Sequence, residues 1–408
     1  MSEAIKKLLK GKQFLLLQGP MGPFFNDMAY WLESLGREAV NVVFNGGDRF
    51  YCRKRKYLAF MQTEKEFSAW LNQVKRDYDF DTILCFGDCR TLHKVAKGWA
   101  HTQGVRFFVF EEGYLRPNFI TLEEGGVNGN SSLPRDAEFY RQLLAQPAAK
   151  IEACYPSKIR RMAHASWYYF ISWYYRHTFD QYCHHKPFSP WREATYWFRA
   201  GWRKTLYQFK QRYILNRLTI ELDQRYYLAI LQVYNDSQIE HHSPYNDVRD
   251  YIYEVMCSFA QHAPADTYLV IKHHPMDCGH RNYAALINEL CKRLNIIDRV
   301  VYIHDLPLRE LILHAQGVVT INSTAGILAL MHGKRIKVMG EALYDIRGVT
   351  FQSGLDFFWR DQFTIDDYLF KNFMSHLTCQ TQVNIHYYQW NVFSSKVWSE
   401  LEDVQNFK

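Results

Sequence analysis

Residues 81–110 read DTILCFGDCRTLHKVAKGWAHTQGVRFFVF, and this stretch holds two continuous apolar runs, 81–86 and 105–110, with a helical segment between them. Short apolar runs that alternate with helices are typical of strands buried on both faces of a parallel sheet. The stretch therefore predicts a strand–helix–strand unit of an α/β fold.

The same alternation extends in both directions along the chain. Nearer the N-terminus, two strands and an intervening helix are expected at QFLLLQ (13–18), AVNVVF (39–44) and PFFNDMAYWLESLG (23–36). After residue 224, five apolar runs predict a second sheet: YYLAILQVY (226–234), TYLVIKH (267–273), RVVYI (299–303), GVVTI (317–321) and RIKVM (335–339). We therefore predict two Rossmann-like lobes that face each other across a cleft, with ligands at the carboxyl ends of the strands.

This pattern also predicts the domain boundaries. Residues 1–150 are expected to form the first lobe, residues 223–385 the second lobe, and residues 386–408 a final helix that crosses back to the first lobe. Between the lobes, residues 151–222 are expected to be helical and are rich in aromatic and basic side chains. Over 150–217, thirteen Lys and Arg stand against three acidic residues, a local charge of +10 compared with +7 for the whole chain.

The composition of the 408 residues indicates a cytoplasmic protein. No N-terminal run is typical of a secretory signal, and no stretch approaches the roughly 20 apolar residues of a membrane span. The nine cysteines are an odd number and include no CxxC pair. They indicate a reducing compartment rather than a disulfide framework or a structural zinc site.

Two clusters of acidic residues follow predicted strands. Glu111 and Glu112 come directly after the run 105–110, and a carboxylate there can act as a general acid or base when burial raises its pKa. Arg116 is expected to hold a ligand carboxylate. Asp236 follows the first strand of the second lobe, where a carboxylate can attack a sugar's anomeric carbon. A solvated acidic turn and an ordinary strand-to-turn segment are the alternatives, and each is the stronger interpretation when its motif is taken alone.

Two further clusters have the chemistry of a phosphate site. In Lys272-His273-His274-Pro275 the proline restricts His274 to an extended backbone, and the imidazole and ammonium groups suit a phosphate leaving group. Metal binding is the alternative, but no third and fourth ligand lie at zinc spacing. Asn322, Ser323 and Thr324 precede a predicted helix, where hydroxyl and backbone N–H groups either bind an anion or only cap the helix.

Other nucleotide-binding motifs are missing from the sequence. The glycines of residues 18–23 do not form GxGxxG, and no Walker A motif occurs. The Asp-x-Asp at 79–81 precedes a predicted strand and so lies at the end opposite to a bound diphosphate. We therefore expect a transferase that needs neither a metal nor another cofactor.

Six segments, in a consistent order between about residues 13 and 350, resemble the capsule polysaccharide KpsS/LipB family: LQGPMGPFF, FNGGD, FEEGYLRP, LQVYNDSQI, KHHP and INSTAGI. The resemblance implies a GT-B fold and a retaining β-Kdo transferase with CMP-β-Kdo as donor. It implies a phosphatidylglycerol-type lipid, in its full or lyso form, as the acceptor on which the poly-Kdo linker of a capsule begins. Capsule biosynthesis and export proteins are then expected partners.

The resemblance also implies roles for individual residues. Glu112 would be the acid/base residue, Asp236 the nucleophile, and His274 with Ser323 and Thr324 would hold the CMP phosphate. The remaining motif residues divide into two predicted sets. Donor contacts are expected from Lys272, Pro275 and Asn322, and contacts to the acceptor or sugar from Gly19, Phe24, Asn45, Asp48, Glu111 and Arg116.

The basic aromatic segment suits an anionic membrane surface, as expected for an enzyme with a lipid acceptor at the inner face of the inner membrane. Its tryptophans are Trp167, Trp173, Trp191, Trp197 and Trp202. The alternative is a lobe-linking helical pair with an aromatic core, and no module for nucleic acid is visible. For the whole protein, the alternatives are a sialyl- or other CMP-sugar transferase, and a non-catalytic component of capsule export.

Overall fold

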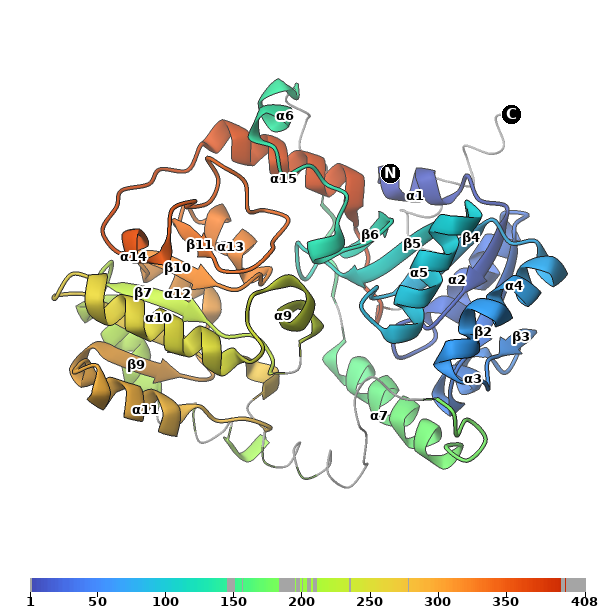
Figure 1. The fold of residues 1–408 in the computed structure, drawn as a ribbon, viewed down its shortest axis with the longest axis horizontal. Coiled ribbons are helices and arrows are strands. Elements are labelled where there is room, and N and C mark those ends of the chain that lie inside the picture. The colour runs from blue at the N-terminus through green and yellow to red at the C-terminus, as the bar shows by residue number, and fades with distance from the viewer. Residues whose placement is uncertain are drawn as a thin grey trace. The chain divides into compact units, whose positions relative to one another are not determined.

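The protein is described by a computed structural model that covers residues 2–144, 151–155, 157–182, 195, 199, 201–203, 207, 211–234, 236–277, 279–389 and 393. The chain divides into two compact units. The first comprises Met1–Ser132, Gln146–Pro190 and Met374–Lys408, and the second comprises Leu133–Ala145 and Trp191–Phe373. Each unit is built around its own sheet (Figure 1).

The first unit contains a seven-stranded sheet in the order β12-β6-β5-β4-β1-β2-β3. Its strands are β1 (Gln13–Leu16), β2 (Glu38–Val43), β3 (Tyr57–Ala59), β4 (Thr82–Phe86), β5 (Arg106–Glu112), β6 (Ile120–Glu124) and β12 (Gln382–Val383). The run from β5 to β3 is parallel, whereas β6 and β12 pair antiparallel. The helices of this unit are α1 (Glu3–Leu8), α2 (Phe24–Ser34), α3 (Gly46–Cys52), α4 (Phe67–Tyr78), α5 (Thr91–Gln103) and α7 (Lys158–Tyr174).

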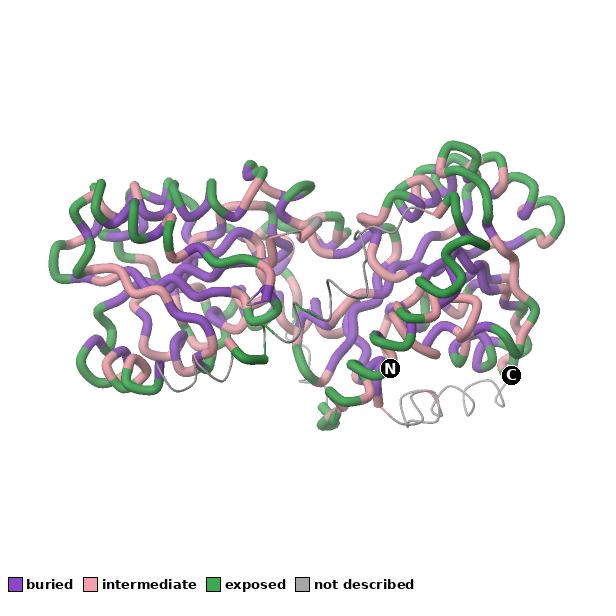
Figure 2. Tube along the Cα trace, turned by 90° about the horizontal axis from the view of Figure 1, so that it is seen from below, coloured by how far each residue is buried: buried purple, intermediate pink, exposed green. Residues whose placement is uncertain are grey.

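The central strands of the first unit are buried on both faces, which explains their continuous apolar sequence. Along β5, Phe107 and Val109 pack into one hydrophobic cluster, and Phe108 and Phe110 pack into another on the opposite face. Figure 2 shows the buried positions gathered along the strands of both sheets. Because side chains alternate along a strand, Glu111 and Glu112 at the end of β5 also point to opposite faces.

The second unit contains a five-stranded, wholly parallel sheet in the order β11-β10-β7-β8-β9. Its strands are β7 (Tyr226–Ile230), β8 (Tyr268–Lys272), β9 (Val300–Ile303), β10 (Gly317–Thr320) and β11 (Ile336–Val338). Its helices are α6 (Ala137–Gln142), α9 (Ser237–His242), α10 (Val248–His262), α11 (Ala284–Arg293), α12 (Leu308–His314), α13 (Ala325–Met331) and α14 (Leu355–Phe358). A short π-helix, Arg217–Glu221, precedes β7.

The predicted fold class of two parallel α/β lobes is confirmed, and every predicted strand corresponds to an observed one. The predicted cleft between the lobes stays a prediction. Three strands were not predicted: β3 and β12 are only three and two residues long, and the sequence of β6 ends in two glutamates.

The boundaries of the units differ from the predicted ones. Helix α7 lies within residues predicted to link the lobes, but it belongs to the first unit. The chain passes from the second unit to the first inside α15 (Asp367–Thr381), earlier than the predicted crossing after residue 385. The predicted final helix lies largely outside the described residues, as do Trp191 and Trp197.

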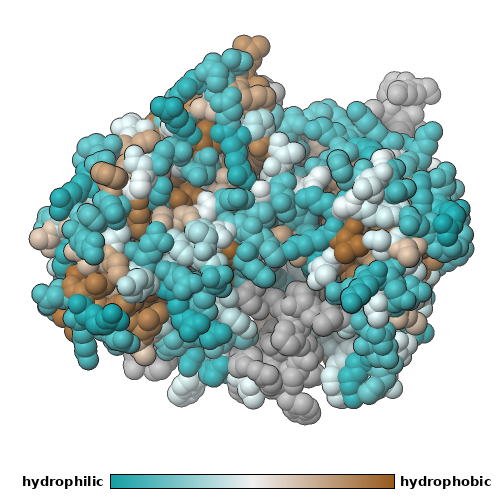
Figure 3. Space-filling view, viewed as in Figure 1, coloured by the Kyte–Doolittle hydropathy of each residue, from teal (hydrophilic) through white to brown (hydrophobic). Residues whose placement is uncertain are grey.

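Polar side chains cover most of the face drawn in Figure 3, and hydrophobic patches interrupt them on both units. Within the described parts of the chain, no helix has the length and hydrophobicity needed to cross a membrane.

Candidate functional site

Three neighbouring strands of the second unit bring the predicted donor residues to one edge of the sheet. Strands β10, β7 and β8 are adjacent, and all three are parallel, so their carboxyl ends meet at the same edge. Asn322, Ser323 and Thr324 follow β10, Asp236 follows β7, and His274 follows β8. The sequence therefore identified residues that are distant along the chain but gather within one unit.

A glutamine absent from the predicted set links two of these strand ends. Gln232 is 5% exposed and donates to Asn322 Oδ1 across 2.9 Å and to Asp236 Oδ2 across 3.3 Å. The backbone N–H of Asn322 in turn donates to Gln232 Oε1 at 3.2 Å. The second oxygen of Asp236, Oδ1, accepts from the Gln238 backbone at 3.0 Å, so Asp236 also caps α9. Both carboxylate oxygens are thus held in a fixed orientation.

The two histidines after β8 differ in their surroundings. His273 is 1% exposed, and burial is the main cause that lowers its pKa to about 4, so its ring is neutral at pH 7. His274 is only partly buried, and its Nδ1 accepts from the Met276 backbone at 3.2 Å. Pro275 begins a short 3-10 helix, so the chain turns directly after His274. His274 is therefore the histidine with the surface available for a ligand.

Lys272 and His304, at the ends of β8 and β9, are both buried. The Lys272 ammonium, 4% exposed, donates to the His304 backbone carbonyl at 3.0 Å and so connects the ends of β8 and β9. The His304 ring stacks on Tyr207 with 3.8 Å between ring centroids, and burial is the main cause that lowers its pKa to about 3. In this structure Lys272 therefore links the ends of β8 and β9. Its predicted contact with the donor stays a prediction.

The segment after β10 is held from both sides. Ser323 Oγ accepts from the Ala325 backbone at 3.2 Å, and the Tyr344 hydroxyl donates to the Ser323 carbonyl at 2.6 Å. Asn322 donates from its Nδ2 to the carbonyls of Gln238 and His242, at 3.0 and 3.2 Å. Ser323 and Thr324 are half-buried at the edge of the sheet.

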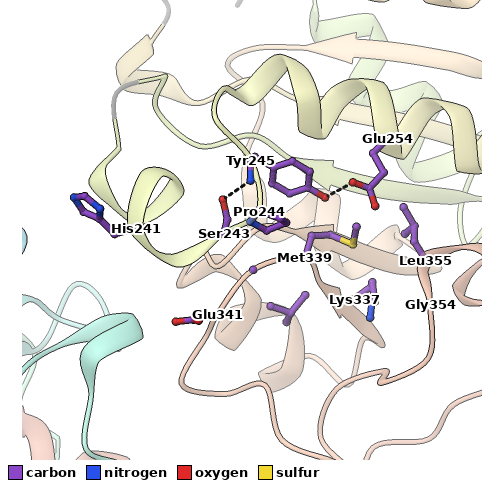
Figure 4. A pocket seen from close by; sticks show the side chains of 12 residues that line it. His241, Ser243, Pro244, Tyr245, Glu254, Lys337, Met339, Glu341, Gly354 and Leu355 are labelled. Atoms are coloured by element: carbon purple, nitrogen blue, oxygen red, sulfur yellow. Dashed lines mark hydrogen bonds between the residues drawn. The ribbon is translucent and has the colours of Figure 1, made fainter.

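A cavity of about 550 Å³ lies beside this edge, between the segment that joins α9 to α10 and the end of β11. Figure 4 shows Tyr245 with its hydroxyl bonded to Glu254, Lys337 on β11, and Met339 directly after that strand. The remaining lining residues include His241, Ser243, Pro244, Glu341 and Leu355. None of the predicted site residues line this cavity. Its lining residues come from segments that are separate in the sequence.

In the first unit, Glu111 and Glu112 have different partners. Glu112 forms an ion pair with Arg161 of α7 at 3.3 Å. Glu111 accepts from the Glu112 backbone at 2.9 Å, and burial, assisted by the Glu112 charge, raises the pKa of Glu111 to about 7. Of the two, Glu111 therefore has the protonation equilibrium expected of a group that exchanges protons near neutral pH.

Asn45 and Asp48 hold α7 against α3, and their contact with the acceptor or sugar stays a prediction. The Tyr168 hydroxyl donates to Asp48 Oδ1 at 2.7 Å, and Asn45 Nδ2 donates to the same hydroxyl at 2.8 Å. Gln18 also donates to Asp48, at 3.1 Å. Asn45 is 3% exposed, so a ligand reaches its side chain only if α7 moves away.

Three other predicted residues of the first unit have distinct positions. Phe24 is 2% exposed and packs among aromatic rings, including Phe110 at 5.5 Å, and its contact with the acceptor or sugar stays a prediction. Gly19 lies against Phe25, whose ring is 2.7 Å from where a Cβ would stand. Arg116 is exposed and donates to the Gly113 carbonyl at 3.0 Å.

Similarity to known proteins identifies the family. A model of the capsule polysaccharide biosynthesis protein family matches residues 81–388. The capsule polysaccharide export protein KpsS of Escherichia coli is 64% identical over 385 residues, which cover 94% of this chain and 99% of that protein. The chain belongs to the capsule polysaccharide KpsS/LipB family. The capsule polysaccharide modification protein LipB of Neisseria meningitidis serogroup A is 34% identical over 400 residues, 96% of each chain.

Solved structures similar to this KpsS/LipB family member include those of KpsC and HepE. KpsC of Thermosulfurimonas dismutans, described as a β-Kdo 2,7 transferase, is 14% identical, with 88% of each chain covered and a TM-score of 0.39. HepE of Anabaena in complex with UDP-glucose is 11% identical, with 97% of this chain and 100% of that chain covered and a TM-score of 0.35.

Proposed function

We propose that this KpsS/LipB family member is a retaining β-Kdo transferase. It moves Kdo from CMP-β-Kdo to a phosphatidylglycerol-type lipid, full or lyso, and so begins the poly-Kdo linker of a capsular polysaccharide. One observation carries the proposal: Asp236, His274 and Ser323-Thr324 lie at the ends of three adjacent parallel strands of one unit. A carboxylate next to hydroxyl and imidazole groups suits a glycosyl phosphate, because one part of the site meets the sugar and the other its leaving group.

The proposed reaction is a double displacement at the anomeric carbon of Kdo. Asp236 attacks this carbon, and the bond to the CMP phosphate breaks with its electron pair leaving on the phosphate. His274, Ser323 and Thr324 stabilise the departing phosphate by hydrogen bonds. The acceptor hydroxyl then loses its proton to a carboxylate and displaces Asp236, so the two inversions give net retention.

The carboxylate that takes this proton belongs to the pair Glu111-Glu112. The family resemblance assigns the role to Glu112, but Glu112 is paired with Arg161. The burial that raises the pKa of Glu111 to about 7 favours Glu111, and we propose it as the base on that ground. His274 and the hydroxyls of Ser323 and Thr324 replace the metal that other transferases use for the leaving phosphate, so the proposed reaction needs no cofactor.

An Asp236→Ala variant tests the proposal. With CMP-Kdo and a lysophosphatidylglycerol analogue, the native protein should give a lipid product one Kdo heavier, with retained configuration. The variant should lose transfer and show no sugar-sized mass adduct in intact-protein mass spectrometry. Because Asp236 also caps α9, the variant should lose about 1 kcal/mol of stability.

Asp247→Ala is the matched control, since Asp247 caps α10 in the same unit and accepts from the Arg249 backbone at 2.8 Å. It should lose similar stability and keep transfer. Near-normal transfer by Asp236→Ala would show that Asp236 is not the nucleophile. A product formed only from CMP-sialic acid would show that the protein is a sialyltransferase, which is the alternative function. Failure to release CMP with any acceptor would favour a non-catalytic export component.

A further inference from the structure

Helix α7 exposes a continuous apolar stripe. Residues three or four positions apart share one face of a helix. Six large apolar side chains are exposed, and most lie three or four positions from another of the set: Ile159 (81%), Met162 (50%), Trp167 (46%), Phe170 (46%), Trp173 (37%) and Tyr174 (61%). A surface helix of a globular domain normally turns its apolar stripe towards the core, so α7 has the reverse arrangement.

The opposite face of α7 is fastened to the first unit, so the stripe cannot turn inward by rotation of the helix. Tyr168, 5% exposed, bonds to Asp48 and Asn45, and Ser172 Oγ donates to Asn45 Oδ1 at 3.0 Å. Two glycines let the helices approach closely. A Cβ on Gly46 would stand 2.6 Å from the Ile171 carbonyl, and one on Gly47 would stand 2.6 Å from the Tyr168 ring.

The aromatic surface continues from α7 onto α3. Trp167 stacks on Phe170 with ring centroids 5.6 Å apart, and Phe170 lies 6.3 Å from Trp173. Phe50 of α3 meets Trp167 edge to face at 5.8 Å. We call these six α7 residues with Phe50 the aromatic stripe.

The charged side chains that α7 and α3 themselves contribute beside the aromatic stripe are mainly basic. Helix α7 contains no acidic residue, and the single acid of α3, Asp48, is engaged with Tyr168 and Gln18. The Arg53 guanidinium lies 4.5 Å over the Phe50 ring, and Arg176 lies 4.8 Å over the Trp173 ring. Lys158 is exposed at the start of α7.

We infer that the aromatic stripe is the surface through which the first unit contacts an anionic phospholipid membrane. Trp and Tyr rings favour the headgroup region, the apolar side chains reach the acyl boundary, and flanking Lys and Arg attract anionic lipid. The inference deepens the proposed function, because it names the surface that brings the enzyme to a lipid acceptor. The role of this surface in reaching the acceptor rests on the proposed function, whereas the membrane contact itself does not.

Sedimentation with lipid vesicles tests the contact without measuring transfer. The full chain is mixed with vesicles of phosphatidylcholine alone or with phosphatidylglycerol added. The native protein should bind the anionic vesicles, and binding should weaken as salt rises. A double variant, Phe170→Ser with Tyr174→Ser, should bind about tenfold more weakly. Equal binding by this variant, or no binding by the native protein, would overturn the inference.

The second unit offers a matched control. Phe357 and Tyr253 are exposed by 59% and 52%, and Phe357→Ser with Tyr253→Ser should leave vesicle binding unchanged. Charge is tested in the same way, by Lys158→Glu with Arg176→Glu against Lys371→Glu with Arg360→Glu. Loss of binding in the control pairs as well would show that the contact is not specific to the stripe, and it too would overturn the inference.

Transfer to a short-chain, water-soluble lysophosphatidylglycerol analogue separates this inference from the proposed function. The stripe variants should retain transfer to the soluble acceptor and lose most transfer to the same headgroup in vesicles. Binding of native protein to vesicles without transfer to either acceptor would reject the proposed function and keep the membrane contact. Transfer to both acceptors by the stripe variants would reject the membrane contact and keep the function.

Discussion

The Tyr168 hydroxyl donates a hydrogen bond to Asp48 Oδ1 across 2.7 Å, and this contact joins two helices that lie 120 residues apart in the sequence. Asp48 ends the FNGGD motif, whose Asn45 and Asp48 are predicted to contact the acceptor or sugar. In the structure the two glycines of this motif lie directly against α7. A motif typical of a loop at a ligand site thus serves a contact between helices.

Gly47→Ala should destabilise the protein through this contact. The added Cβ would stand 2.6 Å from the Tyr168 ring and 2.7 Å from Ser172 Oγ, so α7 would have to shift. The expected loss is about 1–3 kcal/mol in the free energy of unfolding, measured by urea denaturation.

Gly98→Ala is the control, and it should change the free energy of unfolding in the opposite direction. Gly98 lies inside α5, and nothing stands within 4 Å of where its Cβ would be. An alanine there should stabilise the protein by about 0.5–1 kcal/mol, because it favours the helix. If both variants shifted stability in the same direction, the close approach at Gly47 would not be what holds α7.

The sequence was sufficient to predict most of the strands and the edge of the sheet where the predicted donor residues meet. It succeeded because buried parallel strands are continuous apolar runs, and the polar residues directly after them must lie at one edge. It gave no sign of Gln232, because a buried glutamine at the end of a strand resembles any other polar residue until its partners are known. The residues that cover Gly46 and Gly47 were equally hidden, since they lie more than 100 positions further along the chain.

Adjacent residues on a strand show a second limit of prediction. The alternation of β5 places Glu111 and Glu112 on opposite faces, but the sequence does not tell which face is enclosed. That depends on packing around the strand end, where Glu112 meets Arg161 and burial raises the pKa of the partly exposed Glu111. The unpredicted antiparallel strand β6 also lies here and pairs Glu111 with Thr121.

The pH dependence of transfer should report Glu111. A base must be ionised, and the pKa of Glu111 is raised to about 7, mainly by burial. We therefore expect kcat/KM to fall as the pH drops below about 7, and Glu111→Gln to lose most activity together with this acid limb. Glu112→Gln removes a nearby negative charge, so it should move the limb to lower pH while it retains activity. The reverse result, with activity lost only in Glu112→Gln, would return the role to Glu112.

Transfer should not require a divalent metal. The groups proposed to hold the leaving phosphate are His274 and the hydroxyls of Ser323 and Thr324, and the Asp-x-Asp at 79–81 lies directly before β4, at the opposite end of that strand. We expect the initial rate with CMP-Kdo to change by less than about twofold in excess EDTA, and added Mg²⁺ to leave it unchanged. A rate that EDTA abolishes and Mg²⁺ restores would contradict this arrangement of the phosphate site.

Gln232→Ala should lower transfer without removing any group that is proposed to touch the substrate. The native side chain donates to both Asn322 and Asp236. Its loss leaves Asn322 Oδ1 without this donor and frees one carboxylate oxygen of Asp236. A lost hydrogen bond at a buried position costs about 1–3 kcal/mol, so kcat should fall roughly 10- to 100-fold if the orientation of Asp236 matters.

The split between kinetic constants distinguishes positioning from folding. If Gln232 only stabilises the unit, Gln232→Ala should lower the melting temperature and leave kcat per folded molecule unchanged. If it orients Asp236, kcat should fall more than KM rises, and Gln232→Glu, which accepts rather than donates and adds a charge beside Asp236, should be at least as impaired. Gln352→Ala, at an exposed glutamine of the same unit, should leave kcat unaltered. Unchanged kcat in both Gln232 variants would show that Asp236 does not depend on this contact.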